Sequence, residues 1–309
     1  MIKAFTITNY LGDSIVLEME KPDLSGFSIK SVKGLGPSKA NINTTEVSTN
    51  DGSMFNSARL NERNIVFELE FYEDNLAHES IEDLRQKTYK YFPMKKTVEI
   101  QIETDNRIVK TIGNVESNEP NIFSIKENTQ ISIICPDPYF YSVGEEDGSQ
   151  TTVFYGIEAT FEFPFSNESL VEPLIEFGNI QNKSENLITY NGDAEIGLTI
   201  QIHAIGTVGG VTIYNTGTRE TMKIDMVKLA SYTGQGLVSG DDIIINTVKG
   251  EKSITLIRNG VSTNILNCLD KASKWFSLTK GDNIFAFTAT IGTENLQFWI
   301  TNDTIYEGV

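Results

Sequence analysis

Apolar and polar residues alternate with a period of two along most of the chain. The longest such run covers residues 64–73, where Ile65, Phe67, Leu69 and Phe71 occupy every second position. Shorter runs cover residues 98–102, 130–133, 198–202, 211–214, 242–246, 253–257, 283–290 and 296–300. A period of two is typical of half-buried strands. The pattern therefore predicts a mainly β protein.

Turn-forming sequences separate these runs. Asn50-Asp51-Gly52, Thr104-Asp105-Asn106 and Ile112-Gly113-Asn114 are hairpin-type sequences in the first half of the chain. In the second half the turns are rich in glycine, as at 191–193, 209–210, 239–241, 259–260 and 280–282. Short strands at this regular spacing favour an antiparallel sandwich.

One segment, residues 78–92, has helical spacing instead. Its sequence HESIEDLRQKTYKYF places Ile81, Leu84, Thr88 and Tyr91 on one face. Ser80 can cap the start with Asp83 three residues later, and Pro93 ends the helix. A single apolar stripe must be covered by a sheet or by a neighbouring subunit. Ile81, Leu84 and Tyr91 are the candidate residues for such a contact. A weaker helix is predicted over residues 264–274.

The chain is long enough for two domains. At 309 residues it exceeds what one hydrophobic core usually organises. Residues 142–156, SVGEEDGSQTTVFYG, are polar, acidic and contain glycine, so they are the predicted linker. We expect a β domain with the helix at 1–141 and a β-sandwich at 157–309.

Composition narrows the class of protein. Hydrophobic residues make up 39% and charged residues 22%, which is typical of a folded protein. No apolar run approaches the roughly 18 residues that span a bilayer, and the alternating N-terminus lacks the apolar core of a signal peptide. We expect the chain to be made and folded in a cytoplasm. The net charge of −17, without a cluster of Lys and Arg, argues against specific nucleic-acid binding.

Residues for chemistry are few. His78 and His203 are the two histidines, and neither lies in a nucleophile motif. Cys135 and Cys268 lack metal-binding or disulfide spacing and are expected to be buried thiols. We therefore predict no catalytic residue, no metal site and no cofactor.

Three further patterns could indicate ligand binding. Asp241-Asp242 lacks the spaced ligands of a calcium loop and fits a turn entering a strand. Residues 33–37, KGLGP, lack the remaining glycine of a phosphate-binding loop and the Lys and Ser/Thr that follow it. Trp275 and Trp299 could stack on sugars, although core packing is the favoured interpretation of both.

An ordered set of segments in both halves resembles the siphophage distal tail protein family, often called Dit. In the first half the set includes residues 31–39, 49–55, Arg59, Arg63, 84–92, 104–107, 112–116 and the phrase ICPDPYF at 134–140. In the second half it includes residues 190–194, 237–241, 275–283 and 305–309.

The resemblance implies a tail-tube-like N-terminal β-barrel or sandwich with one helix, and a galectin-like or jelly-roll C-terminal sandwich. It also implies a homo-hexameric ring at the virion tail tip or baseplate, which joins the tail tube to the tip and lets DNA pass. In such a ring, made in the cytoplasm of a bacterial host, we assign Ile81, Leu84 and Tyr91 of the helix to packing between subunits. The implied partners are the major tail tube protein, the tape measure protein, a tail-associated hub or lysin protein and a receptor-binding protein.

Two other functions remain open. The C-terminal domain could be a carbohydrate-binding module that contributes to adhesion to the host cell wall. A tail-associated hydrolase is disfavoured because no catalytic signature is present.

Overall fold

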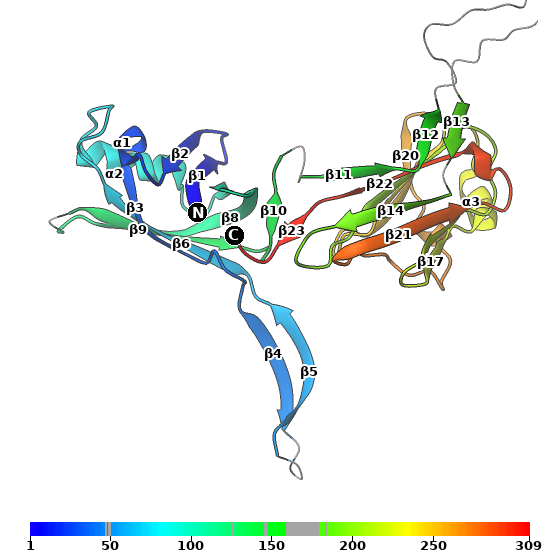
Figure 1. Ribbon diagram of the computed structural model, residues 1–309, viewed down its shortest axis with the longest axis horizontal. Coiled ribbons are helices and arrows are strands. Elements are labelled where there is room, and N and C mark those ends of the chain that lie inside the picture. The colour runs from blue at the N-terminus through cyan, green and yellow to red at the C-terminus, as the bar shows by residue number, and fades with distance from the viewer. Residues whose placement is uncertain (47, 49–50, 125, 145–147, 159–178, 183) are drawn as a thin grey trace, which may run out of the picture. The chain divides into compact units, whose positions relative to one another are not determined.

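The chain forms two units, which we analysed in a computed structural model (Figure 1). The structure describes residues 1–46, 48, 51–124, 126–144, 148–158, 179–182 and 184–309. Unit 1 comprises Met1–Gly148 together with Ile305–Val309, and unit 2 comprises Ser149–Thr304. The chain thus leaves unit 1, builds unit 2 and returns to unit 1 for its last residues.

Unit 1 is built on one antiparallel sheet. Its strands follow the order β2-β1-β7-β8-β9-β6-β3, with β10 pairing to β8 and to β23. The bounds are β1 (Ile2–Asn9), β2 (Ser14–Glu18), β3 (Phe27–Lys33), β6 (Arg63–Phe71), β7 (Thr97–Thr104), β8 (Ile108–Asn121), β9 (Asn128–Cys135), β10 (Phe140–Ser142) and β23 (Ile305–Tyr306). A separate hairpin consists of β4 (Ala40–Glu46) and β5 (Ser53–Leu60).

Two helices belong to unit 1, the short α1 (Pro22–Ser25) and α2 (Ile81–Tyr91). Ser80 and Asp83 form the capping box that the sequence predicts, with Asp83 N–H donating to Ser80 Oγ at 3.2 Å and Ser80 N–H donating to Asp83 Oδ2 at 3.1 Å. The α2 helix contacts β1, β6 and β8. Below it lies an aromatic and aliphatic core in which Phe5 and Phe67 meet edge to face at 5.3 Å.

Unit 2 contains two principal sheets. One has the order β11-β22-β15-β18-β19-β20 and the other β14-β21-β16-β17. Their bounds are β11 (Gln150–Val153), β14 (Glu185–Tyr190), β15 (Thr199–Ala204), β16 (Thr212–Asn215), β17 (Glu220–Lys223), β18 (Asp242–Asn246), β19 (Ser253–Arg258), β20 (Val261–Asn264), β21 (Gly281–Thr288) and β22 (Leu296–Asn302). A further pair is β12 (Tyr155–Glu158) with β13 (Asn179–Asn182).

The two principal sheets of unit 2 share a core. Phe298 of β22 stacks on Phe287 of β21 with ring centres 4.9 Å apart, and Phe154 meets both rings edge to face. The mainly β class and the sandwich predicted from the sequence are thus confirmed. Part of the segment expected as a linker forms β11 and the start of β12, while residues 145–147 lie outside the described chain.

The helix of unit 2 lies where the sequence analysis did not expect it. It is α3 (Met226–Thr233), capped by the Asp225 carboxylate, which accepts from the N–H groups of Val227 and Lys228. The helix predicted over 264–274 is wrong, since β20 extends to Asn264 and only the 3-10 turn η1 (Leu266–Cys268) follows. The Asp270 carboxylate accepts from Ala272 N–H at 2.8 Å, and such local bonds compete with a helix. A second 3-10 turn is η2 (Thr293–Asn295). In the described chain, no helix is long and apolar enough to cross a membrane.

Candidate assembly surface

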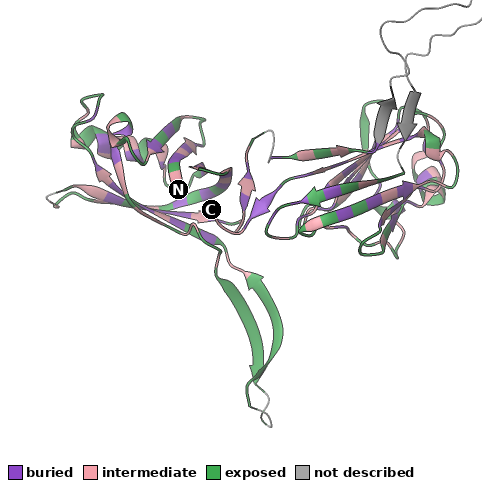
Figure 2. Cartoon of the chain, viewed as in Figure 1, coloured by how far each residue is buried: buried purple, intermediate pink, exposed green. Residues whose placement is uncertain are grey.

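The β4–β5 hairpin is the most exposed regular element of unit 1. It leaves the nine-stranded sheet as a two-stranded ribbon (Figure 1), and nearly all of its described residues are exposed (Figure 2). Strands of this length span about 25 Å. An isolated two-stranded hairpin is marginal in water, so this ribbon is a surface that a partner would stabilise.

The two faces of the hairpin differ in chemistry. Residues directly opposite each other in an antiparallel pair lie on the same face, and residues two apart in one strand do too. One face carries the apolar residues Ala40, Ile42, Phe55, Ala58 and Leu60 together with Thr44, Ser53 and Glu46. The other carries Asn41, Asn43, Thr45, Met54, Ser57 and Arg59. Ile42 is 60% exposed and Phe55 63% exposed, so the apolar face is open to solvent.

Hydrogen bonds between side chains stiffen the ribbon. Asn43 donates to Ser57 Oγ at 3.1 Å on the polar face. Where the register shifts after Asn43, Asn56 donates to Thr45 Oγ1 at 2.6 Å. These bonds help keep the strands paired without help from a core. The apolar face is therefore presented by a connected ribbon.

Arg63 fixes the base of the hairpin. This side chain is only 2% exposed, at the point where the chain leaves β5 and enters β6. In the described chain, its five hydrogen bonds all end on backbone carbonyl oxygens, at 2.5 to 2.9 Å. The acceptors are Gly34, Gly36, Pro138 and Glu307. Gly34 and Gly36 lie on the segment that leads into β4, so Arg63 ties the entry to the exit of the hairpin.

An aromatic ring covers the Arg63 guanidinium, and the Asp137 carboxylate and the Cys135 thiol act on its charge from nearby. The guanidinium lies 4.1 Å from the centre of the Phe140 ring, a cation–π distance. Burial lowers the pKa of this guanidinium below its usual value. Because an arginine pKa starts far above neutral, the side chain stays charged. A buried charge is tolerated only when it is well hydrogen-bonded. Here the four carbonyl oxygens accept those hydrogen bonds.

The helix residues assigned to ring packing lie elsewhere. Leu84 is fully buried in the core of unit 1, and Ile81 and Tyr91 are partly buried against that core. The apolar stripe of α2 is thus covered within its own unit and needs no second subunit. The reason for placing a ring contact on Ile81, Leu84 and Tyr91 is therefore removed, and the hairpin replaces them as the candidate surface.

The two tryptophans are half-buried, so the expectation that both lie in the core is wrong. Trp299 alternates with the buried Phe298 and Ile300 in β22, and its indole N–H donates to Gln201 at 3.1 Å. Trp275 lies with the Lys252 ammonium 5.3 Å from its ring centre. The two indole rings therefore have different neighbours, Gln201 for Trp299 and Lys252 for Trp275.

His203 and the acidic pair have protein partners. Arg258 forms a two-pronged ion pair with Asp241, which is 1% exposed, at 2.8 and 2.6 Å. Asp242 lies 2.8 Å from His203 Nδ1. His78 takes a positive φ of 53° in the turn before α2. Among the described residues, no cluster of three His, Cys, Asp or Glu side chains could hold a metal ion. Cys135 and Cys268 are free and buried as expected.

Sequence reasoning missed the role of Arg63 and the extent of the hairpin. A signal for Arg63 exists, because it continues the period of the buried positions Ile65, Phe67, Leu69 and Phe71 by one step toward the N-terminus. A charged residue at an inward position must have partners nearby. That pattern indicates a buried arginine from the sequence alone.

Comparison with known proteins points to phage tails. Residues 191–299 match the family model described as siphovirus-type tail component, C-terminal domain. Among solved structures, the Dit protein of phage SPP1 is similar, with a TM-score of 0.60 and 14% identity over 97% of this chain and 99% of that chain. That protein is described as a paradigm of the hub adsorption apparatus in phages that infect Gram-positive bacteria.

A weaker likeness is to the phage p2 baseplate in its activated conformation with Ca, with a TM-score of 0.44, 13% identity and 98% coverage of both chains. No curated protein matches the sequence. The predicted resemblance to the Dit family is confirmed by the family match in unit 2 and by the shared fold.

Proposed function

We propose that this protein is a structural component of a phage tail tip, where copies assemble into a ring through the β4–β5 hairpin. The family match of unit 2 and the fold shared with a tail hub protein support a role in the tail. The hairpin supplies the assembly surface, since its apolar face is exposed and its base is fixed. This exposed apolar ribbon is the observation that carries the proposal.

The ring is expected to hold six copies and to join the tail tube to the tip. Contacts between identical copies around a closed ring are head-to-tail, so the apolar face of one hairpin meets a different surface on the next copy. The net charge of −17 suits a channel through which DNA passes, because basic side chains would retain the phosphates. The tail tube, tape measure, hub and receptor-binding proteins are the proposed neighbours, and the virion is the proposed location.

The proposal assigns no catalysis to this chain. Its relatives by family and fold are tail and baseplate components. The role of the protein then depends on its contact surfaces, and a substitution on the exposed face of the hairpin is expected to change assembly directly. The second candidate, glycan binding by unit 2, draws its support from the half-exposed Trp275.

Matched charges on opposite faces of the hairpin test the proposal. Purified wild-type protein is expected to show about six times the chain mass by mass photometry, and rings in negative stain. Ile42→Asp and Phe55→Asp place a charge on the apolar face and are expected to leave monomers. Asn41→Asp places the same charge on the polar face and is expected to retain the ring. A wild-type protein that stays monomeric at all concentrations, or equal assembly of all variants, would overturn the proposal.

A further inference from the structure

The last residues of the sequence complete unit 1. Ile305–Val309, here called the C-terminal segment, follow the whole of unit 2 yet belong to unit 1. Within the segment, β23 pairs with β10 through Phe140 opposite Tyr306 and Tyr141 opposite Ile305. Since β10 also pairs with β8, the segment joins the main sheet.

The segment contacts the base of the hairpin. The Glu307 carbonyl accepts from Arg63 Nη2 at 2.7 Å, and Val309 N–H donates to the Leu35 carbonyl at 3.0 Å. A Cβ at Gly308 would lie 3.2 Å from the Leu35 oxygen, so glycine allows this close approach. Leu35 lies on the entry to the hairpin and Arg63 on its exit. The segment therefore contacts both legs of the hairpin.

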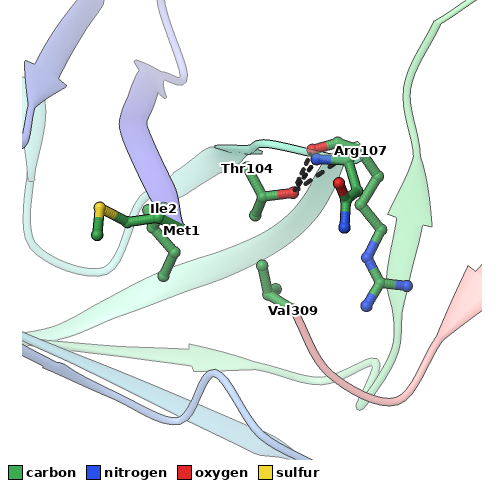
Figure 3. A pocket seen from close by; sticks show the side chains of 6 residues that line it. Met1, Ile2, Thr104, Arg107 and Val309 are labelled. Carbon is green, nitrogen blue, oxygen red and sulfur yellow. Dashed lines mark hydrogen bonds between the residues drawn. The ribbon is translucent and has the colours of Figure 1, made fainter.

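Side chains hold the segment in place. Ile305 is 3% exposed and Tyr306 9% exposed. The Arg107 guanidinium lies 4.2 Å from the centre of the Tyr306 ring. Thr104 holds the backbone of Arg107, with Thr104 Oγ1 donating to the Arg107 carbonyl at 2.9 Å and accepting from its N–H at 3.1 Å (Figure 3). The β7–β8 turn thus provides a formed docking site.

The end of the segment reaches the first strand. Val309 lines an open pocket of about 440 Å³ together with Met1, Ile2, Thr104 and Arg107 (Figure 3). The N-terminal ammonium of Met1 pairs with the Asp105 carboxylate in the neighbouring turn. Met1 is therefore bound to the β7–β8 turn of unit 1, and Val309 lies beside the same turn.

We propose that docking of the C-terminal segment positions the hairpin, so that a chain becomes competent for assembly only after the residues that follow unit 2 are made and docked. N-terminal units generally fold first during synthesis. Without the segment, Arg63 loses one of its four carbonyl partners and Leu35 loses its backbone bond, which loosens both legs of the hairpin. Incomplete chains are thereby kept out of the ring. This inference rests on the assembly role proposed above.

The test uses the full chain with the segment weakened or removed. Tyr306→Ala and deletion of residues 305–309 are compared with Tyr232→Ala, which removes an exposed tyrosine from α3. Trypsin cleavage after Arg59, which is exposed in β5, measures the mobility of the hairpin, and mass photometry measures assembly. We expect cleavage and the apparent dissociation constant of assembly to rise about tenfold or more, the effect of losing one bond to a charged group. Tyr232→Ala is expected to match wild type.

Each outcome decides the inference. Unchanged cleavage and assembly in both segment variants would overturn it. Loss of the circular dichroism of unit 1 would also overturn it, because the segment would then be needed for folding and not for positioning. Arg107→Ala weakens docking more mildly and is expected to give a smaller increase in cleavage with the fold intact. If wild type forms no ring, the assembly role fails, while the cleavage assay still tests positioning in the monomer.

Discussion

Replacing Arg63 by methionine tests the structural argument most severely. The substitution keeps much of the side-chain volume and removes every donor to the carbonyls of Gly34, Gly36, Pro138 and Glu307. Each hydrogen bond to a charged group contributes about 1.5–3 kcal/mol. A simple sum over these bonds overestimates the effect, because burying the guanidinium is itself unfavourable.

We expect Arg63→Met to lower the free energy of unfolding of unit 1 by about 4 kcal/mol, because four carbonyl oxygens lose their donor at about 1–3 kcal/mol each, and the removal of a buried charge offsets part of that loss. For a unit of this size that loss corresponds to a fall in melting temperature on the order of 10 °C. The stability of Arg63→Lys is expected to lie between those of wild type and Arg63→Met, because an ammonium keeps the charge but cannot reach four carbonyls with its three donors.

The two tryptophans make the assay specific. The sequence has two tryptophans, Trp275 and Trp299, and both lie in unit 2. Urea unfolding followed by tryptophan fluorescence therefore reports on unit 2 and is expected to be unchanged by Arg63→Met. Hydrogen exchange of β6 and β9 reports on unit 1. Arg59→Met removes an exposed arginine four positions away and serves as the control. A loss in unit 1 below about 1 kcal/mol, like that of an exposed arginine, would refute the reasoning.

Three further predictions concern α2 and unit 2. Leu84→Ala is expected to lower the free energy of unfolding of unit 1 by about 2–5 kcal/mol in thermal melting. Tyr89 is half-exposed, so Tyr89→Ala should have little effect. Equal effects of the two substitutions would contradict the burial of the apolar face of α2. Burial raises the pKa of the Asp241 carboxyl, but the bond from Arg258 outweighs it and holds the pKa below its usual 3.8. The stability from this pair is therefore present above 3.8, the unfolded value, and is lost as the pH falls through the lowered pKa of the folded state. Acid unfolding of unit 2 should show this loss, and Asp241→Asn should abolish it. For the glycan alternative, Trp275→Ala should abolish retention on purified cell walls with the fold intact, and unchanged retention would exclude this ring.

The regular parts of the fold could be predicted because burial and sequence period agree there. Residues 64–73 alternate, and β6 covers Arg63–Phe71 with every second side chain buried. The capping box of Ser80 and Asp83 and the stop at Pro93 place α2 within a few residues of its observed ends. In unit 2, α3 was missed because only its Asp225 cap and Gly234 end mark it in the sequence. Its single fully buried residue, Leu229, leaves no stripe to detect.

The β4–β5 hairpin was not predicted, for a different physical reason. A period of two is visible only when one face of a strand is covered by the same chain, and β4 and β5 have no such cover. Their apolar residues, Ile42 and Phe55, lie on a face that the chain itself leaves open. A segment that pairs as strands yet buries little in the monomer is marginally stable and gains stability when another surface covers it. The same reasoning applies to Arg63. Burying a cation to fix the base of an exposed ribbon is unfavourable for the monomer. A fixed base holds the ribbon in one orientation, which is an advantage when the ribbon must contact a partner.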